Sequence, residues 1–164
     1  MQKNLLKKIR YMIVFFIIAL ALSGITAFPV YTELKWLMET GWLNTTHFPG
    51  NWLQRVYAGV ANTQASYPFL FYGYDWLAFA HLMIAALFYG VYKDPVKNKF
   101  IIDWGMFCCM AIIPLAFICG SIRGIPFLHI LIDCSFGIIG IIPLMICRKY
   151  IVQLENVITA EHSL

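Results

Sequence analysis

Three long apolar runs, separated by two short polar hinges, fill the sequence from Tyr67 to Ile151. A fourth apolar run precedes them near the N-terminus. About 20 apolar residues in a helix are enough to cross the hydrocarbon core of a bilayer. We therefore expect an all-α, integral membrane four-helix transmembrane bundle, with residues 1–164 as a single transmembrane domain. The predicted spans are residues 11–28, 75–92, 100–119 and 125–147.

Composition supports a chain that lies largely in lipid. Hydrophobic residues make up 61% of the sequence and charged residues only 12%, whereas soluble domains carry about 25% charged residues. The net charge of +4 comes from basic residues at the ends of the apolar runs, as topology signals do. No basic stripe with interleaved aromatic residues is present, so we expect no nucleic-acid partner.

The first apolar run has two possible readings. A basic start followed by an apolar run and small residues also resembles a secretory signal peptide. Residues 11–28 are longer, however, than the usual apolar core of such a signal. We therefore expect this run to be the first transmembrane helix. At the other end, we expect the fourth span to be followed by a short helical tail over residues 150–164.

The one long polar segment, residues 30–72, predicts two short helices that cap one end of the bundle. Thr32 is placed to start the first and Gly41 to end it, and Asn51 is placed to start the second. Apolar residues recur at helical spacing in both, and Trp36 and Trp52 are typical of helices in the membrane interface. We expect this cap to be extracytoplasmic.

Orientation follows from the distribution of Lys and Arg between the two sides. If both termini and the hinge at residues 93–99 share one side, that side holds nine of the twelve basic residues. Cytoplasmic loops carry the excess of Lys and Arg. We therefore expect both termini to be cytoplasmic. The nine residues are Lys3, Lys7, Lys8, Arg10, Lys93, Lys97, Lys99, Arg148 and Lys149.

A few ionisable residues lie within or at the outer ends of the predicted spans, and they are the main functional lead. An ionisable residue inside a membrane is costly and commonly functional. Counted along the predicted helices, they converge on the outer half of the bundle at depths of roughly 6–12 Å or less. The candidate ligand- or proton-binding residues are Asp75, His81, Arg123, His129 and Asp133. His129 or Arg123 is placed to pair with Asp133.

Small residues at helical spacing predict the faces on which the helices meet. In the first span Ala19, Ser23 and Ala27 recur every four residues. In the fourth, Gly137 and Gly140 continue the stripe of His129 and Asp133, so we expect Asp133 to face the bundle interior, as we expect of His81. Near the cytoplasmic end, we expect Lys97 or Lys99 to be the partner of Asp103.

These residues leave several functions open. The polar groups either satisfy one another as a purely structural pairing or line a pocket. Our leading hypothesis is a non-enzymatic protein that binds a lipid, a quinone-like or other small ligand, or a partner protein. The alternative is a haem- or quinone-linked redox protein that uses His81 and His129 as axial ligands. A metal site of His81, His129 and Asp133 is possible by ligand type.

The five cysteines lie inside apolar runs and form no CxxC motif. We expect them to be packing residues. The alternative is a thiol redox pair such as Cys109 with Cys134, although neither has an acidifying neighbour in sequence.

Three segments carry a resemblance to a known family: YPFLFYGYDWLAFAH, KDPVKN and RGIPFLHILIDCSFGIIGIIPL. They resemble a family of small four-span bacterial membrane proteins with no assigned function. The resemblance covers roughly residues 23–151. It implies a bacterial inner membrane and no particular activity or cofactor.

Overall fold

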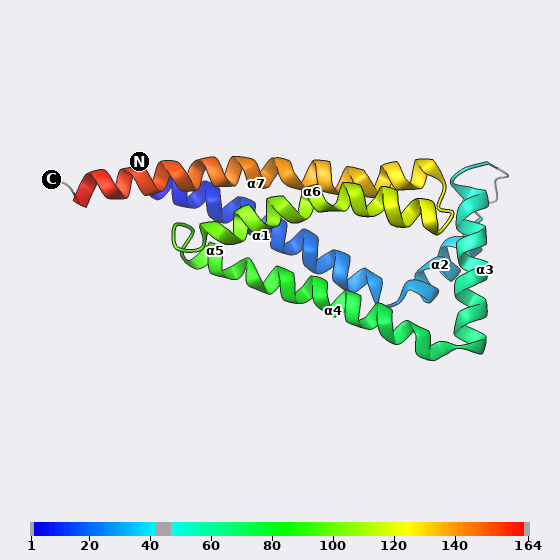
Figure 1. Cartoon of the computed structure of the whole chain (residues 1–164). Coiled ribbons are helices and arrows are strands. Elements are labelled where there is room, and N and C mark those ends of the chain that lie inside the picture. The colour runs from blue at the N-terminus through cyan, green and yellow to red at the C-terminus, as the bar shows by residue number, and fades with distance from the viewer. Residues whose placement is uncertain (1, 42–46, 163–164) are drawn as a thin grey trace. The chain divides into compact units, whose positions relative to one another are not determined.

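The computed structural model describes residues 2–41 and 47–162, and these form helices joined by short turns (Figure 1). Residues 42–46 of the predicted cap lie outside the described residues. The helices are α1 (Gln2–Ala27), α2 (Val30–Glu39), α3 (Gly50–Ser66), the 3₁₀ helix η1 (Pro68–Phe71), α4 (Tyr72–Leu87), α5 (Tyr89–Lys93), α6 (Lys99–Ile122) and α7 (Phe127–His162). The all-α prediction is confirmed.

Within the described residues, four stretches of helix are long and apolar enough to cross a membrane, as predicted. They are Gln2–Ala27, Pro68–Lys93, Lys99–Ile122 and Phe127–Glu161. The second combines η1, α4 and α5. Large apolar side chains remain exposed along these helices, for example Phe107, Phe136 and Ile139, each more than 60% exposed. Lipid is the environment that would cover such surfaces.

The first and last helices extend beyond the predicted spans. α1 begins at Gln2 rather than at residue 11, and α7 continues to His162 rather than ending at residue 147. Packing explains both extensions, because Ile9 on α1 and Ile151 and Leu154 on α7 are almost completely buried. The polar ends are therefore held as helix by an apolar face that continues past the membrane-length run.

The two predicted cap helices form as α2 and α3, but their starts differ from the prediction. α2 follows Pro29 and α3 follows Pro49, and neither start has a side-chain cap. The prediction of Thr32 and Asn51 as starting residues is therefore wrong. Proline is tolerated at these positions because N–H groups at the start of a helix have no acceptor within the helix, so its missing N–H leaves no bond unmade. Gly41 follows α2 with a φ of 71°, a left-handed conformation that ends helices.

The chain divides into two compact units, each described separately below. Unit 1 comprises residues 1–18 and 85–164, and unit 2 comprises residues 19–84. The boundaries fall within α1 and α4. In unit 1, α6 and α7 run antiparallel and side by side (Figure 1). In unit 2, α2 contacts α3.

Close backbone approach joins α6 to α7 in unit 1. Ile130, Gly137, Leu144 and Ile151 recur every seven residues on α7 and are all buried. At Gly137 an added Cβ would overlap the backbone carbonyl oxygen of Cys109 on α6. Glycine is therefore the residue that allows the two backbones to meet, as small residues do between membrane helices.

Unit 2 has its own close crossing, between α1 and α4. A Cβ at Gly24 would lie 2.8 Å from the carbonyl oxygen of Ala78 and 3.1 Å from the Cβ of His81. Ala19 and Ser23, members of the predicted small-residue stripe, are exposed. The contact face of α1 is therefore the one that carries Gly24, and the stripe prediction for this helix is wrong at those two positions.

Candidate functional site

The five predicted site residues fall on both units. Asp75 and His81 lie on α4 in unit 2, whereas Arg123, His129 and Asp133 lie at the α6–α7 turn and on α7 in unit 1. The site as a whole therefore stays a prediction, and its two halves are described in turn.

On α4, His81 is half-buried and its imidazole has a backbone partner. Its Nδ1 lies 2.9 Å from the carbonyl oxygen of Leu77, one turn earlier. Because a carbonyl can only accept, this hydrogen bond places the proton on Nδ1, and the neutral ring then offers Nε2 as an acceptor or ligand. The Cβ of His81 also lies at the close contact with Gly24, so the position of the ring is tied to the packing of α1 against α4.

Asp75 lies in the first turn of α4 and borders an aromatic pocket of about 310 Å³. The other lining residues are Phe28, Tyr72, Trp76 and Phe79. The ring of Trp76 packs edge-on against both Tyr72 and Phe79, with centroids 6.0 and 6.1 Å apart. The wall of this pocket is almost entirely apolar and aromatic, so Asp75 borders it without presenting its carboxylate to the interior.

On α7, His129 and Asp133 form an i,i+4 pair. The Nε2 of His129 lies 3.9 Å from the Oδ1 of Asp133, and the side chains are 35% and 44% exposed. This distance allows electrostatic attraction but exceeds that of a hydrogen bond. Arg123 is exposed at the C-terminal end of α6, and within the described residues no ion pair joins it to Asp133. Of the two partners predicted for Asp133, the structure brings His129 close.

The buried face of α7 lies beside this pair rather than on it. Ile130 and Cys134, which follow His129 and Asp133 directly, are the buried residues of that helical region. Asp133 therefore lies at the edge of the helix contact, not in its centre. The close contact at Gly137 fixes which face of α7 is covered by α6, and the expectation that Asp133 faces the bundle interior stays a prediction, because α4 belongs to the other unit.

The predicted partner of Asp103 is also wrong. The Nε of Arg148 on α7 lies 2.5 Å from the Oδ1 of Asp103, and Lys99 pairs with Glu155 at 2.6 Å. Both pairs join α6 to α7. The continuation of α7 beyond residue 147 supplies these partners, so a prediction that ended the fourth helix there assigned Asp103 to its neighbours in sequence.

All five cysteines are free thiols, and Cys109, Cys134 and Cys147 are buried. Among the residues that the structure describes, no three His, Cys, Asp or Glu side chains are placed to hold a metal ion.

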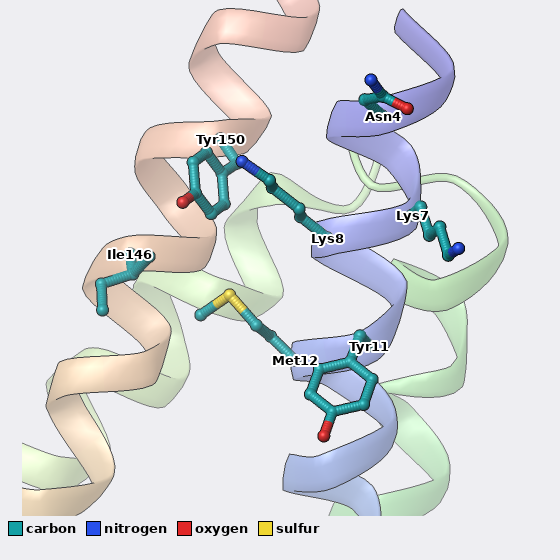
Figure 2. Close-up of a pocket in the computed structure, with 7 residues that line it drawn as sticks. All are labelled: Asn4, Lys7, Lys8, Tyr11, Met12, Ile146 and Tyr150. Atoms are coloured by element: carbon teal, nitrogen blue, oxygen red, sulfur yellow. The ribbon is translucent and has the colours of Figure 1, made fainter.

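Sequence reasoning missed a set of grooves lined by basic and aromatic residues in unit 1. One of them lies between α1 and α7 and has a volume of about 590 Å³. Figure 2 shows Lys8 reaching from α1 toward the ring of Tyr150 on α7, with Met12 and Ile146 further along the groove. The signal in the sequence was the cluster of lysines before residue 11, which indicated only orientation. The pairing of α1 with the end of α7 is needed to form the groove.

The fold defines this chain as a multi-pass membrane protein, with four helices of membrane-spanning length in the part of the chain that the structure describes. Comparison with protein-family models, curated proteins and solved structures found no match. The assignment to multi-pass membrane proteins therefore rests on the length and apolar content of the helices.

Proposed function

We propose that this protein is a non-enzymatic, multi-pass protein of the bacterial inner membrane with both termini cytoplasmic. It binds a lipid-like or quinone-like small ligand, or a membrane partner, at a polar site in the outer half of its helices. The observation that carries the proposal is the half-exposed His129–Asp133 pair within the apolar part of α7. Arg123, at the turn before α7 in the same unit, belongs to the proposed site, and Asp75 and His81 of unit 2 are proposed separately as ligand- or proton-binding residues.

The exposure of Asp133 argues for a binding role beyond the pairing with His129. A carboxylate at membrane depth costs about 2.5–3.5 kcal/mol on insertion scales unless it is paired or reaches water. A pair serving only to hold helices together would be short and covered by the neighbouring helix. The carboxylate of Asp133 instead keeps 44% of its side chain accessible and lies 3.9 Å from the imidazole. Its remaining acceptor positions are open to a ligand.

The chemistry around the proposed site indicates the kind of ligand. Imidazole and carboxylate groups offer hydrogen-bond donors and acceptors. Their neighbours on α7, such as Leu128, Leu131 and Ile132, are exposed apolar side chains. A molecule with a polar head and an apolar body, such as a quinone or a lipid, matches both features.

Asp133→Asn is expected to abolish ligand binding while leaving the unliganded protein nearly as stable as the wild type. At 3.9 Å the His129–Asp133 pair is longer than a hydrogen bond, so replacing the carboxylate by an amide of the same shape removes little that holds the helix in place. A ligand present at 100 times its dissociation constant stabilises its protein by about 2.7 kcal/mol. Thermal unfolding of the purified protein, with and without a short-chain quinone or a phospholipid, measures both quantities. Ser135→Ala, two residues further along α7, is the matched control.

The opposite pattern would contradict the proposal. If Asp133→Asn lowers stability by several kcal/mol without any ligand, and every tested ligand stabilises variant and wild type equally, the pair is purely structural.

A second function, b-type haem binding, is favoured by the hydrogen bond of His81 to Leu77. Histidine ligands commonly donate their other ring N–H to a carbonyl, which orients the ring toward the metal. We expect such a protein, purified under haem-replete conditions, to show a Soret band that shifts on reduction and is lost in His81→Ala. A band that persists in that variant, or a colourless preparation, excludes this function.

A further inference from the structure

The groove between α1 and α7 in unit 1 combines charge, aromatic rings and an apolar floor. Its lining comprises Asn4, Lys7, Lys8, Tyr11 and Met12 from α1 and Ile146 and Tyr150 from α7. Its volume of about 590 Å³ is within the range of ligand sites. None of the seven residues is acidic, so the groove favours an anion.

The chemistry changes along the groove. The amide, the two ammonium groups and the ring of Tyr150 lie toward the start of α1, and Ile146, Met12 and the ring of Tyr11 lie further along (Figure 2). From Asn4 to Met12, a helix rises by roughly 12 Å. A glycerophospholipid has the same sequence of groups, with a charged head followed by an apolar chain.

The groove also lies at the level where a membrane surface is expected. The apolar run of α1 begins at Tyr11, and that of α7 ends near Ile146. Tyrosine is enriched at this level because its ring suits the apolar side and its hydroxyl the polar side. The acyl chains would therefore meet the apolar end of the groove and the phosphate its basic end.

The lysine charges are available for a ligand. Lys8 places its Nζ 5.3 Å from the centre of the Tyr150 ring, a cation–π contact that holds the ammonium over the groove without neutralising it. Neither Lys7 nor Lys8 has an ion-pair partner among the described residues. By contrast, Arg148, which lines a smaller groove nearby, is already paired with Asp103.

Lys7 extends the basic surface around α1. Figure 2 shows it on the side of α1 away from Tyr150, where it also lines a second groove of about 520 Å³ with Lys3 and Arg10. The phosphate of a lipid bound between α1 and α7 would thus contact Lys8 directly. Lys7, on the other side of α1, would attract the phosphate through longer-range electrostatics.

We propose that the groove between α1 and α7 binds the phosphodiester head group of an anionic phospholipid, with an acyl chain along Met12 and Ile146. Basic pockets between membrane helices recognise such head groups. This site is separate from the polar site around Asp133 and does not depend on it.

The test measures retention of phosphatidylglycerol by the purified full-length chain, using native mass spectrometry and titration in phosphatidylcholine nanodiscs. We expect the wild type to prefer phosphatidylglycerol over phosphatidylcholine. K7Q/K8Q should weaken phosphatidylglycerol binding by roughly 30-fold, the effect of removing two lysine charges beside an anionic head group. The matched control K93Q/K97Q removes the same charge from the hinge of unit 1 and should change binding less than about 3-fold.

A second variant changes the shape of the groove without changing its charge. I146W fills the apolar end and keeps every lysine, so it should also weaken phosphatidylglycerol binding. Equal losses in K7Q/K8Q and K93Q/K97Q, or unchanged binding in I146W, would overturn the proposal in favour of general surface attraction. Displacement of the lipid by inorganic phosphate at millimolar concentration would overturn it in favour of a free anion. Circular dichroism in phosphatidylcholine nanodiscs checks that each variant is folded. We expect K7Q/K8Q to fold normally because Lys7 and Lys8 are exposed.

Discussion

Gly137→Ala is expected to lower the free energy of unfolding by about 1–3 kcal/mol, the usual cost of forcing an extra carbon into a packed contact. The new Cβ would overlap the carbonyl oxygen of Cys109 and approach the Cβ of Ile112 to 3.5 Å. A carbonyl in the middle of α6 cannot rotate away as a side chain can. The two helices would have to separate, and the contacts on either side of the glycine would weaken with them.

Gly140→Ala is the matched control for this variant. It adds the same carbon one turn further along α7, with the same gain in helix propensity of up to about 1 kcal/mol. Its nearest neighbour is the Sγ of Cys109 at 3.3 Å, and a side chain can adjust. Denaturant titration of both variants in the same detergent measures the difference. Equal stabilities would show that α6 and α7 do not approach as closely as described.

Gly24→Ala is expected to have a similarly large effect on unit 2. An added Cβ would lie 2.8 Å from the carbonyl oxygen of Ala78, 3.1 Å from the Cβ of His81 and 3.2 Å from the Cγ of Leu82. Three neighbours on α4 would have to move, one of them backbone. We expect a loss of about 1–3 kcal/mol and a displacement of α4 at His81.

Hydrogen exchange can locate this effect within the chain. Gly24→Ala should accelerate amide exchange in residues 72–84, whereas Gly137→Ala should accelerate it in α6 and α7, because each glycine belongs to a different unit. Gly73→Ala is the control for unit 2, since no atom lies within 4 Å of its added Cβ. Faster exchange in α6 and α7 after Gly24→Ala would contradict the division into two units.

The polar site shows where sequence reasoning stops. The i,i+4 spacing of His129 and Asp133 was sufficient to predict their approach, since residues four apart are neighbours on any helix. The spacing did not reveal that Ile130 and Cys134 form the covered face beside them. That choice depends on the rotation of α7 against α6, which the contact at Gly137 sets.

Contacts between distant parts of the chain were equally out of reach. Asp103 was assigned to nearby lysines, whereas its partner is Arg148, 45 residues away. The groove of Lys8 and Tyr150 joins residues even further apart in sequence. Neither pairing leaves a local signal, because each residue by itself is an ordinary polar group at the end of an apolar run.

The sequence by itself determined the class of this protein and the approximate place of its four long helices. Helix length and apolar content are local properties, and backbone groups in lipid must be satisfied within their own helix. Only the tertiary structure decided which faces meet, which glycines allow close approach, and which charges pair. These follow from the fit of one helix surface against another, and shifts of a single residue around a helix are enough to change them.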